Sequence, residues 1–127
     1  MSSYIKVAIK AAIESGSFIR NSVGMVERVS YKGRDNIVTD VDEKSERMIM
    51  SRISSAFPGH SILTEESGFH TKNSSHRWVI DPLDGTTNFA HAFPFFCVSI
   101  ALEISGRCVL GVVYDPKIGR ASCRERV

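Results

Sequence analysis

Apolar side chains recur every three or four positions near the start of the chain. Ile5, Ala8, Ala12 and Ile19 follow this spacing within residues 4–20, and charged side chains fall between them. Since an α-helix has about 3.6 residues per turn, these apolar side chains lie on one stripe. The pattern predicts an amphipathic helix over residues 4–20 that packs this stripe against a core.

A second stretch of helical periodicity covers residues 41–56. Asp40 and Glu43, three positions apart, match the spacing of a capping box in acidic form. The Phe-Pro-Gly run at residues 57–59 is typical of a helix end. The predicted apolar face of this helix consists of Val41, Met48, Ile49 and Ile53.

The second half of the chain has the pattern of β-strands. Its short apolar or alternating runs are bounded by Gly, Pro and Ser, and Ser105-Gly106 is a plausible two-residue hairpin turn. Helices followed by a mostly antiparallel sheet predict an α+β fold. Strands are predicted over residues 61–64, 77–81, 95–104 and 107–114, with a short extended piece over residues 36–39 and a polar loop over residues 69–76.

Composition and charge narrow the class of protein. The 127 residues carry 16 basic and 14 acidic side chains, a formal charge of +2, which is too small to predict a nucleic-acid partner or a basic membrane surface. Three cysteines without a CxxC pair predict no disulfide framework. The charged N-terminus does not fit a secretion signal, and the longest apolar stretch is too short to span a membrane. We therefore expect a cytoplasmic protein with no membrane partner.

Two carboxylates follow the predicted strand at residues 77–81. Val79 and Ile80 bring Asp81 to the edge of the sheet, and Asp84 comes three residues later. Carboxylates at this spacing, with the Leu83 carbonyl between them, are hard oxygen ligands of the kind that Mg²⁺ prefers. The Gly-Thr-Thr run at residues 85–87 adds backbone N–H groups and hydroxyls that suit a phosphate group.

A second acidic cluster, Glu65 and Glu66, follows the predicted strand at residues 61–64. If this strand is parallel to the one over residues 77–81 and beside it, the carboxylates at their ends meet. A third acidic group lies at Asp40 and Asp42. Each cluster taken alone can also be explained without a function, as a surface turn, a solvated loop or a helix cap. Their combination favours a metal-dependent phosphatase.

Three motifs, in this order, resemble the inositol monophosphatase family: IVTDVDEK at residues 37–44, ILTEES at 62–67 and WVIDPLDGTTNF at 78–89. The resemblance covers about residues 4–117. It implies the N-terminal half of the layered α/β/α/β/α fold that this family shares with fructose-1,6-bisphosphatase. It also implies an Mg²⁺-dependent hydrolase that cleaves a phosphate monoester, typically inositol 1-phosphate, and a full-length parent that is a homodimer.

The resemblance also implies roles for individual residues. Glu65, Asp81, the Leu83 carbonyl and Asp84 would hold magnesium, and Glu65 would be counted with the catalytic residues. Asp42 and Thr86 would position or activate the attacking water. The phosphate would be held by Asp84, Gly85, Thr86 and Thr87. Lys32 is a candidate for the mobile active-site loop of the family.

The chain also departs from the family pattern. The family's Trp-Asp-x-Ala motif, which supplies a further metal-ligating Asp, has no counterpart in the 127 residues. Residues 118–127 look like a translated sequencing adapter, so we expect one truncated domain over residues 1–117 and a non-native tail. This truncated chain is expected to expose an apolar sheet and to be inactive. The alternatives are a non-catalytic interaction module, or a related phosphatase that acts on another sugar phosphate or a nucleotide bisphosphate.

Several other side chains are expected to have structural roles only. Phe93, Phe95 and Phe96 are expected in the core, and Cys97 and Cys108 as small buried side chains of strands. The four histidines lack the spacing of a zinc site and are expected to be solvated.

Overall fold

A computed structural model describes residues 2–25, 29–31 and 37–126. In these ranges the chain forms three helices and two sheets, which confirms the α+β prediction. The helices are α1 (Ser3–Asn21), α2 (Asp40–Ala56) and α3 (Thr86–Ala90). The strands are β1 (Val29–Tyr31), β2 (Ile37–Thr39), β3 (Ser61–Thr64), β4 (Gly68–His70), β5 (His76–Asp84), β6 (Cys97–Ile104), β7 (Arg107–Asp115) and β8 (Arg120–Glu125).

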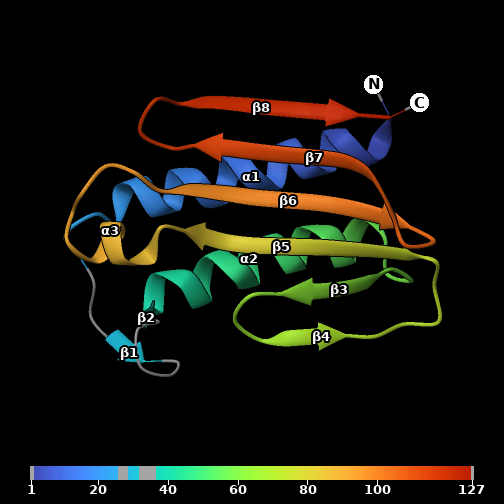
Figure 1. The fold of residues 1–127 in the computed structure, drawn as a ribbon, viewed down its shortest axis with the longest axis horizontal. Coiled ribbons are helices and arrows are strands. Elements are labelled where there is room, and N and C mark those ends of the chain that lie inside the picture. Colours follow the sequence, from blue (N-terminus) through green and yellow to red (C-terminus); the bar gives the residue numbers. More distant parts are fainter. Residues whose placement is uncertain (1, 26–28, 32–36, 127) are drawn as a thin grey trace.

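The larger sheet has six strands in the order β4-β3-β5-β6-β7-β8 (Figure 1). Its pairings are antiparallel except that of β3 with β5, which is parallel. Both strands of this parallel pair therefore end at the same edge of the sheet, where α3 and the start of α2 also lie. Strands β1 and β2 form a separate antiparallel hairpin near this edge.

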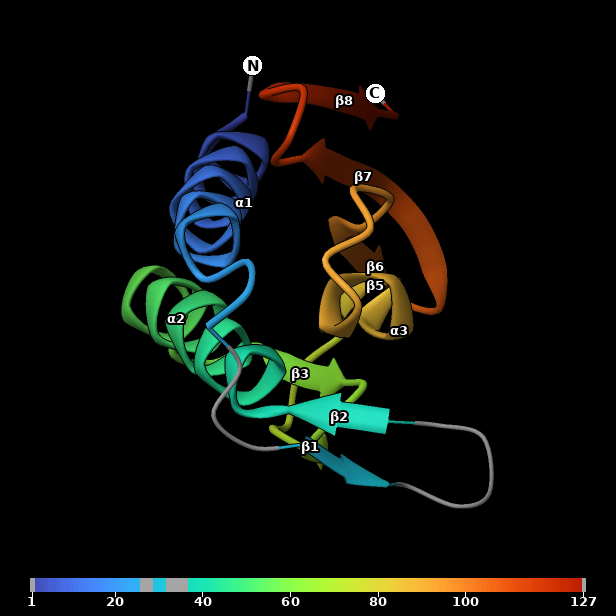
Figure 2. The ribbon, with the colours of Figure 1, turned by 90° about the vertical axis from the view of Figure 1, so that its left-hand side faces the viewer.

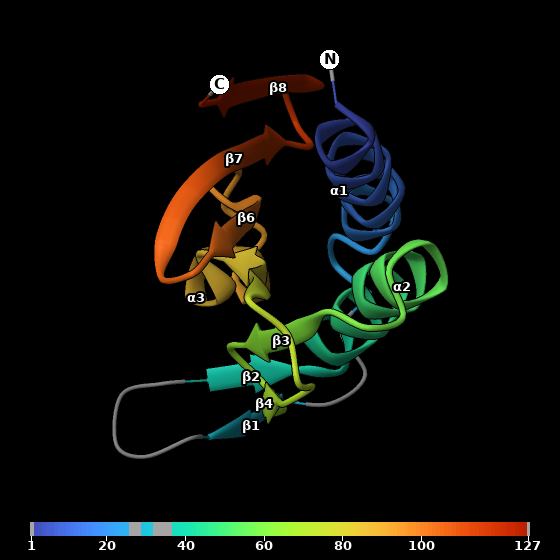
Figure 3. The ribbon, with the colours of Figure 1, turned by 90° about the vertical axis from the view of Figure 1, so that its right-hand side faces the viewer.

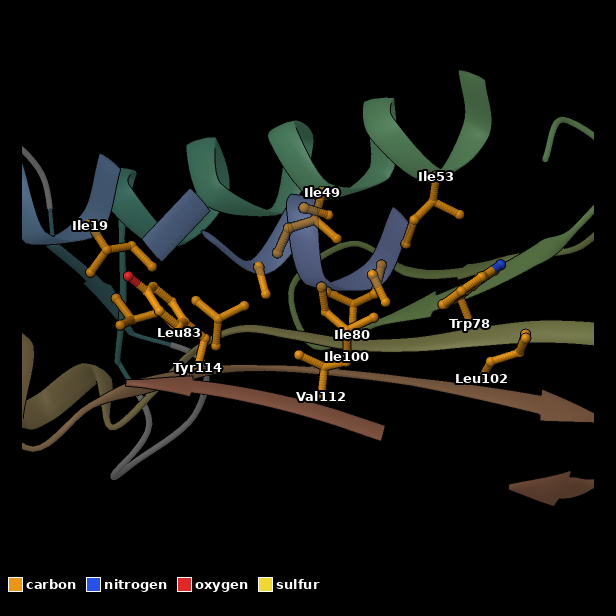
Figure 4. Close-up of a cluster of buried hydrophobic side chains, with 14 of the residues drawn as sticks. Ile19, Ile49, Ile53, Trp78, Ile80, Leu83, Ile100, Leu102, Val112 and Tyr114 are labelled. Carbon is orange, nitrogen blue, oxygen red and sulfur yellow. The ribbon is translucent and has the colours of Figure 1, made fainter. Parts of the chain in front are cut away.

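Helices α1 and α2 lie next to each other on one face of the six-stranded sheet (Figures 2 and 3). Their buried side chains meet those of β5, β6 and β7 to form the core (Figure 4). Trp78, Ile100 and Leu102 are fully buried there from the sheet side, and Ile19, Ile49 and Ile53 from the helix side. The strand residues that point the other way, such as Leu63, Val79, Ala101 and Val113, are only half-buried or exposed.

Helix α1 forms where the periodicity predicts it. Ser2 caps it by accepting a hydrogen bond from the Ile5 N–H at 3.4 Å. Gly16 faces the sheet, and a Cβ atom on it would lie 2.3 Å from the Tyr114 ring. A larger residue at this position would therefore push α1 away from β7.

The start of α2 differs from the prediction by one residue. Thr39, not Asp40, is the N-cap, and its partner in the capping box is Asp42, not Glu43. Both pairs have the spacing of the motif, but Thr39 is 1% exposed and Asp42 is fully buried, so the buried pair satisfies the helix N–H groups. The predicted apolar face is confirmed at Val41, Ile49 and Ile53 and wrong at Met48, which is 37% exposed.

The β half contains two corrections and one strand beyond the predicted domain boundary. The predicted loop over residues 69–76 begins with β4, because Leu63 pairs with Phe69. Strand β5 continues past Pro82 to Asp84, where a register shift accommodates the proline that cannot donate a ladder hydrogen bond. Residues beyond 117 form β8, which pairs with β7 along its length. The hairpin turn is confirmed, since Ser105 and Gly106 both have positive φ.

Other expectations hold only in part. Phe96 is buried, with its ring 5.4 Å from that of Phe89, but Phe93 and Phe95 are more than half exposed. Cys97 is half-buried and Cys108 is exposed on β7. Among the described residues, no helix is long and apolar enough to cross a membrane.

Candidate active site

The parallel pair of β3 and β5 brings two acidic segments together. Thr64 is in register with Ile80, and the next N–H group, that of Glu65, donates to the Ile80 carbonyl at 3.1 Å. Glu65, the first residue after β3, therefore lies beside Asp81, three residues before the end of β5. This confirms the strand adjacency that the sequence analysis assumed.

Asp81 is half-buried within a group of like charges. Burial, together with the negative charges of the nearby Asp84, Glu65 and Glu66, raises the pKa of its carboxyl from 3.8 to about 6. The Leu83 N–H, which donates to Asp81 Oδ1 at 3.3 Å, acts in the opposite direction. These carboxylates are thus close enough to repel one another, which disfavours ionised Asp81 unless a cation is present.

The oxygen atoms of this cluster fit a hard divalent cation. They belong to carboxylates and to the Leu83 carbonyl, whose oxygen lies 3.0 Å from the Thr86 hydroxyl oxygen and has two lone pairs. Within the described ranges, no three His, Cys, Asp or Glu side chains are already arranged to hold a metal ion. Glu65 and Asp84 are exposed, so their side chains have room to turn toward Asp81.

A buried carboxylate, Asp42, lies beside this cluster. Its Oδ1 accepts from both the N–H and the hydroxyl of Thr39, each at 2.6 Å, and its Oδ2 accepts from the Thr86 hydroxyl at 2.7 Å. Complete burial raises the pKa of Asp42, while the hydrogen bonds from Thr39 and Thr86 oppose this shift. Asp42 therefore has two roles, since it closes the capping box of α2 and bonds the first residue of α3.

The turn between β5 and α3 requires a glycine. Gly85 has a φ of +93°, and a Cβ atom on it would lie 2.6 Å from the Phe95 carbonyl oxygen. After this turn Thr86 bonds Asp42, and Thr87, the second residue of α3, is exposed.

The structure thus brings together Asp42, Asp81, Leu83, Asp84 and Thr86, with Glu65 at the neighbouring strand end. Lys32 lies outside the described residues. Two further contacts come from α2. Ser45 donates to the Pro82 carbonyl at 2.8 Å, and Glu46 accepts from backbone N–H groups of the turn after β3.

Sequence reasoning missed Ser45 and Glu46. Both are buried polar residues, one turn of helix after Asp42. This i, i+3, i+4 spacing was visible in the sequence, but it indicates a shared helix face and not the segments that the face contacts.

A hollow of about 960 Å³ lies elsewhere, between the outer surfaces of α1 and α2. Apolar side chains such as Val7, Phe18 and Met48 contribute to its lining. So do five basic side chains: Lys6, Lys10, Lys44, Arg47 and Arg52. Two of these are ion-paired, Lys44 with Asp40 and Arg52 with Glu14. The hollow contains none of the carboxylates around Asp81.

Known proteins are similar to this chain in sequence and in fold. An inositol-1-monophosphatase from Mesorhizobium japonicum is 42% identical over 128 residues, which cover 98% of this chain and 48% of that protein. The Nus factor SuhB of Escherichia coli is 44% identical over 115 residues, 88% of this chain and 43% of that protein. The chain thus spans about half the length of the relatives it matches.

Solved structures of similar proteins have the same fold. The extragenic suppressor protein SuhB from Bartonella henselae superposes with a TM-score of 0.96 at 41% identity, over 98% of this chain and 50% of the other. An IMPase from Thermotoga maritima gives a TM-score of 0.91 at 34% identity, over 98% of this chain and 48% of the other. The sequence profile of the inositol monophosphatase family matches residues 1–125. This chain belongs to the inositol monophosphatase family.

Proposed function

We propose that this chain carries the metal-binding and water-activating part of a magnesium-dependent phosphatase that hydrolyses inositol 1-phosphate. The observation that supports this most is the grouping of Asp81, Asp84 and Glu65 at one sheet edge, next to the buried Asp42–Thr86 hydrogen bond. Family membership supports phosphatase activity in general, and a relative named inositol-1-monophosphatase supports the substrate.

In this proposal Glu65, Asp81, the Leu83 carbonyl and Asp84 hold magnesium. When bound, the metal stabilises negative charge on the phosphoryl group and lowers the pKa of water. The carboxylates must be ionised to act as ligands, so the proton that burial favours on Asp81 has to leave first. Metal binding is therefore expected to strengthen as the pH rises through about 6.

Asp42 and Thr86 orient the attacking water. The Thr86 hydroxyl has one proton and two nearby acceptors, and the Asp42 carboxylate is the stronger acceptor. With its proton held by Asp42, the Thr86 oxygen presents lone pairs that accept a hydrogen bond from water. Asp42 is thus available to receive a proton through Thr86 as the water attacks. Gly85 and Thr87 complete the phosphate-binding turn.

The rest of the proposal concerns the whole protein. The inositol-binding residues and a further metal-ligating Asp would lie outside the matched half, so we propose that the 127-residue chain alone is inactive toward inositol 1-phosphate. We also propose a cytoplasmic location and a homodimeric parent. The domain boundary after residue 117 remains a prediction, with β8 lying beyond it.

Magnesium titration by isothermal calorimetry tests the metal site. The wild-type chain is expected to bind Mg²⁺, and Asp81→Asn and Asp84→Asn are expected to lose this binding. Glu103→Gln is the matched control, because Glu103 pairs with Arg77 near the other end of β5. Binding that is equal in all four proteins, or absent from wild type, contradicts the proposal.

Substrate and mechanism need a phosphate-release assay on the parent protein. Inositol 1-phosphate is expected to be hydrolysed faster than other sugar phosphates and nucleotide bisphosphates. Thr86→Val is expected to lower kcat about 100-fold or more, because the water loses its acceptor. Preference for a nucleotide bisphosphate would refute the proposed substrate, and unchanged kcat in Thr86→Val would refute the role of Thr86.

A second candidate function is a non-catalytic interaction module. It is favoured by the hollow between α1 and α2, because its lining combines apolar side chains with five cationic ones, two of them ion-paired, and this suits an acidic protein segment. Relatives named Nus factor SuhB are compatible with a role besides catalysis. A fluorescent polyglutamate peptide is expected to bind this chain, and the Lys6→Glu/Arg47→Glu variant to bind it at least tenfold more weakly. Equal binding by both proteins would contradict this candidate.

A further inference from the structure

One face of α2 contacts three separate segments of the candidate active site. Asp42, Ser45 and Glu46 share this face because they are three and four residues apart. All three are buried, with exposed fractions of 0%, 0% and 4%. Asp42 bonds Thr86 on α3, Ser45 bonds the end of β5, and Glu46 bonds the turn after β3.

Glu46 makes the most demanding of these contacts. Its Oε1 atom accepts two hydrogen bonds, from the N–H groups of Glu66 and Ser67, each at 3.1 Å. A buried carboxylate is costly, and such charge-assisted bonds compensate for the lost water. The two donors immediately follow Glu65 in the chain. Glu46 therefore fixes the backbone of the turn from which the Glu65 side chain projects.

Ser45 acts on the other acidic segment. Its hydroxyl donates to the Pro82 carbonyl at 2.8 Å. Pro82 lies between Asp81 and Leu83, so this bond fixes the peptide unit between the carboxylate and the carbonyl that are proposed to bind the metal. The two contacts together tie the ends of β3 and β5 to adjacent residues of one helix.

We propose that Glu46, assisted by Ser45, is a positioning residue that sets the affinity of the site for its divalent cation. This inference rests on the proposed function and extends it, because neither residue is a proposed ligand. The helix holds the Glu65 turn at a set separation from Asp81 and Asp84. Without the Glu46 carboxylate, the Glu66 N–H loses this acceptor and the Ser67 N–H is left with Thr64 Oγ1 at 3.0 Å, so the turn can shift away from the other carboxylates.

The test compares Glu46→Ala with Glu46→Gln in the full 127-residue chain. Calorimetric Mg²⁺ affinity is expected to fall about 10- to 100-fold in Glu46→Ala, as for other residues that support metal ligands. Glu46→Gln keeps the accepting Oε1 atom and is expected to stay within about threefold of wild type. Ile53→Val, a core change on the same helix, is the control that lowers the melting temperature but leaves Mg²⁺ affinity unchanged.

Amide hydrogen exchange, followed by NMR without metal, reports the positioning directly. Exchange at the Glu66 N–H group is expected to accelerate at least tenfold in Glu46→Ala and to remain slow in Glu46→Gln and Ile53→Val. The Ser67 N–H is expected to respond less, because it also donates to Thr64 Oγ1 at 3.0 Å. This measurement depends on the hydrogen bonds alone and not on the metal.

The outcomes separate this inference from the proposed function. Absence of Mg²⁺ binding by wild type overturns both. If wild type binds Mg²⁺ and Glu46→Ala binds it equally well, Glu46 is only structural and the inference is overturned, while the proposed function stands. If Glu46→Ala fails to fold, Ser45→Ala is the deciding variant, and its Mg²⁺ affinity is expected to be about three- to tenfold lower than that of wild type. Unchanged Mg²⁺ affinity in Ser45→Ala then overturns the inference.

Discussion

Replacing Asp81 by Asn is expected to stabilise the metal-free chain while abolishing magnesium binding. The folded protein holds the Asp81 carboxyl in a half-buried position beside other carboxylates, which raises its pKa from 3.8 to about 6. In the unfolded chain this environment is lost. Ionisation of Asp81 near neutral pH therefore favours unfolding, and an uncharged Asn avoids this penalty while its Oδ1 still faces the Leu83 N–H.

The size of the effect follows from the pKa shift. A shift of about two units at about 1.4 kcal/mol per unit gives an upper bound of roughly 3 kcal/mol. Partial exposure of Asp81 screens the charges, so about 1–2 kcal/mol is expected at pH 7. The folded-state pKa lies above the unfolded value, so the stability contributed by protonated Asp81 is present below pH 3.8 and is lost as pH rises through about 6.

Urea unfolding in EDTA at several pH values measures this difference. At pH 7, Asp81→Asn is expected to unfold at a higher urea concentration than wild type. The difference should shrink to about a fifth by pH 4, where the folded Asp81 is already protonated. Asp84→Asn is a second informative variant, because removal of the Asp84 charge should lower the pKa of Asp81. This variant should therefore show part of the stability gain of Asp81→Asn.

Two results would refute this reasoning. If Asp81→Asn is less stable than wild type at pH 7, the Asp81 carboxylate does not destabilise the metal-free fold. If the gain is the same at pH 4 and pH 7, it does not arise from ionisation.

The remaining predictions concern the fold around the site. Gly85→Ala places a Cβ atom 2.6 Å from the Phe95 carbonyl oxygen at a φ of +93°, and a thermal melt is expected to show a loss of about 2–4 kcal/mol. Trp78→Phe removes the N–H that donates to His60 Nδ1 at 3.0 Å and replaces a fully buried indole by a smaller ring, so urea unfolding should show a loss of about 1–3 kcal/mol. Burial, with His76 nearby, lowers the pKa of His60 below 6.5. The free energy of unfolding should therefore fall as pH drops through the folded-state pKa of His60, and His60→Gln should reduce this pH dependence of stability. Each prediction fails if the variant and wild type behave alike.

Local sequence patterns predicted the parts of the fold that depend on local rules. Helical spacing at Ile5, Ala8 and Ile19 reflects burial against a sheet, and the hairpin at Ser105 and Gly106 reflects backbone conformations that few other sequences favour. The helix start was displaced by one residue because Thr39-to-Asp42 and Asp40-to-Glu43 have the same spacing. Only the tertiary environment, which buries the first pair, distinguishes them.

Long-range contacts account for what the sequence did not predict. Phe69 lies in an otherwise polar segment. It joins the sheet because its backbone pairs with that of Leu63, on the side of β3 that does not pair with β5. Phe95 looks like a core residue but remains 65% exposed. The contacts of Ser45 and Glu46 depend on which strand ends α2 crosses, and no local pattern contains this information.

The parallel pairing of β3 and β5 has a consequence for how the protein is made. Ser61 pairs with Arg77, only sixteen residues later, so the entropic cost of closing this loop is small for a parallel pair. The residues from Thr39 to Thr87 form one uninterrupted stretch that precedes β6, β7 and β8. As the polypeptide emerges from the ribosome, the acidic strand ends are therefore available to meet before the remaining half of the sheet has been synthesised.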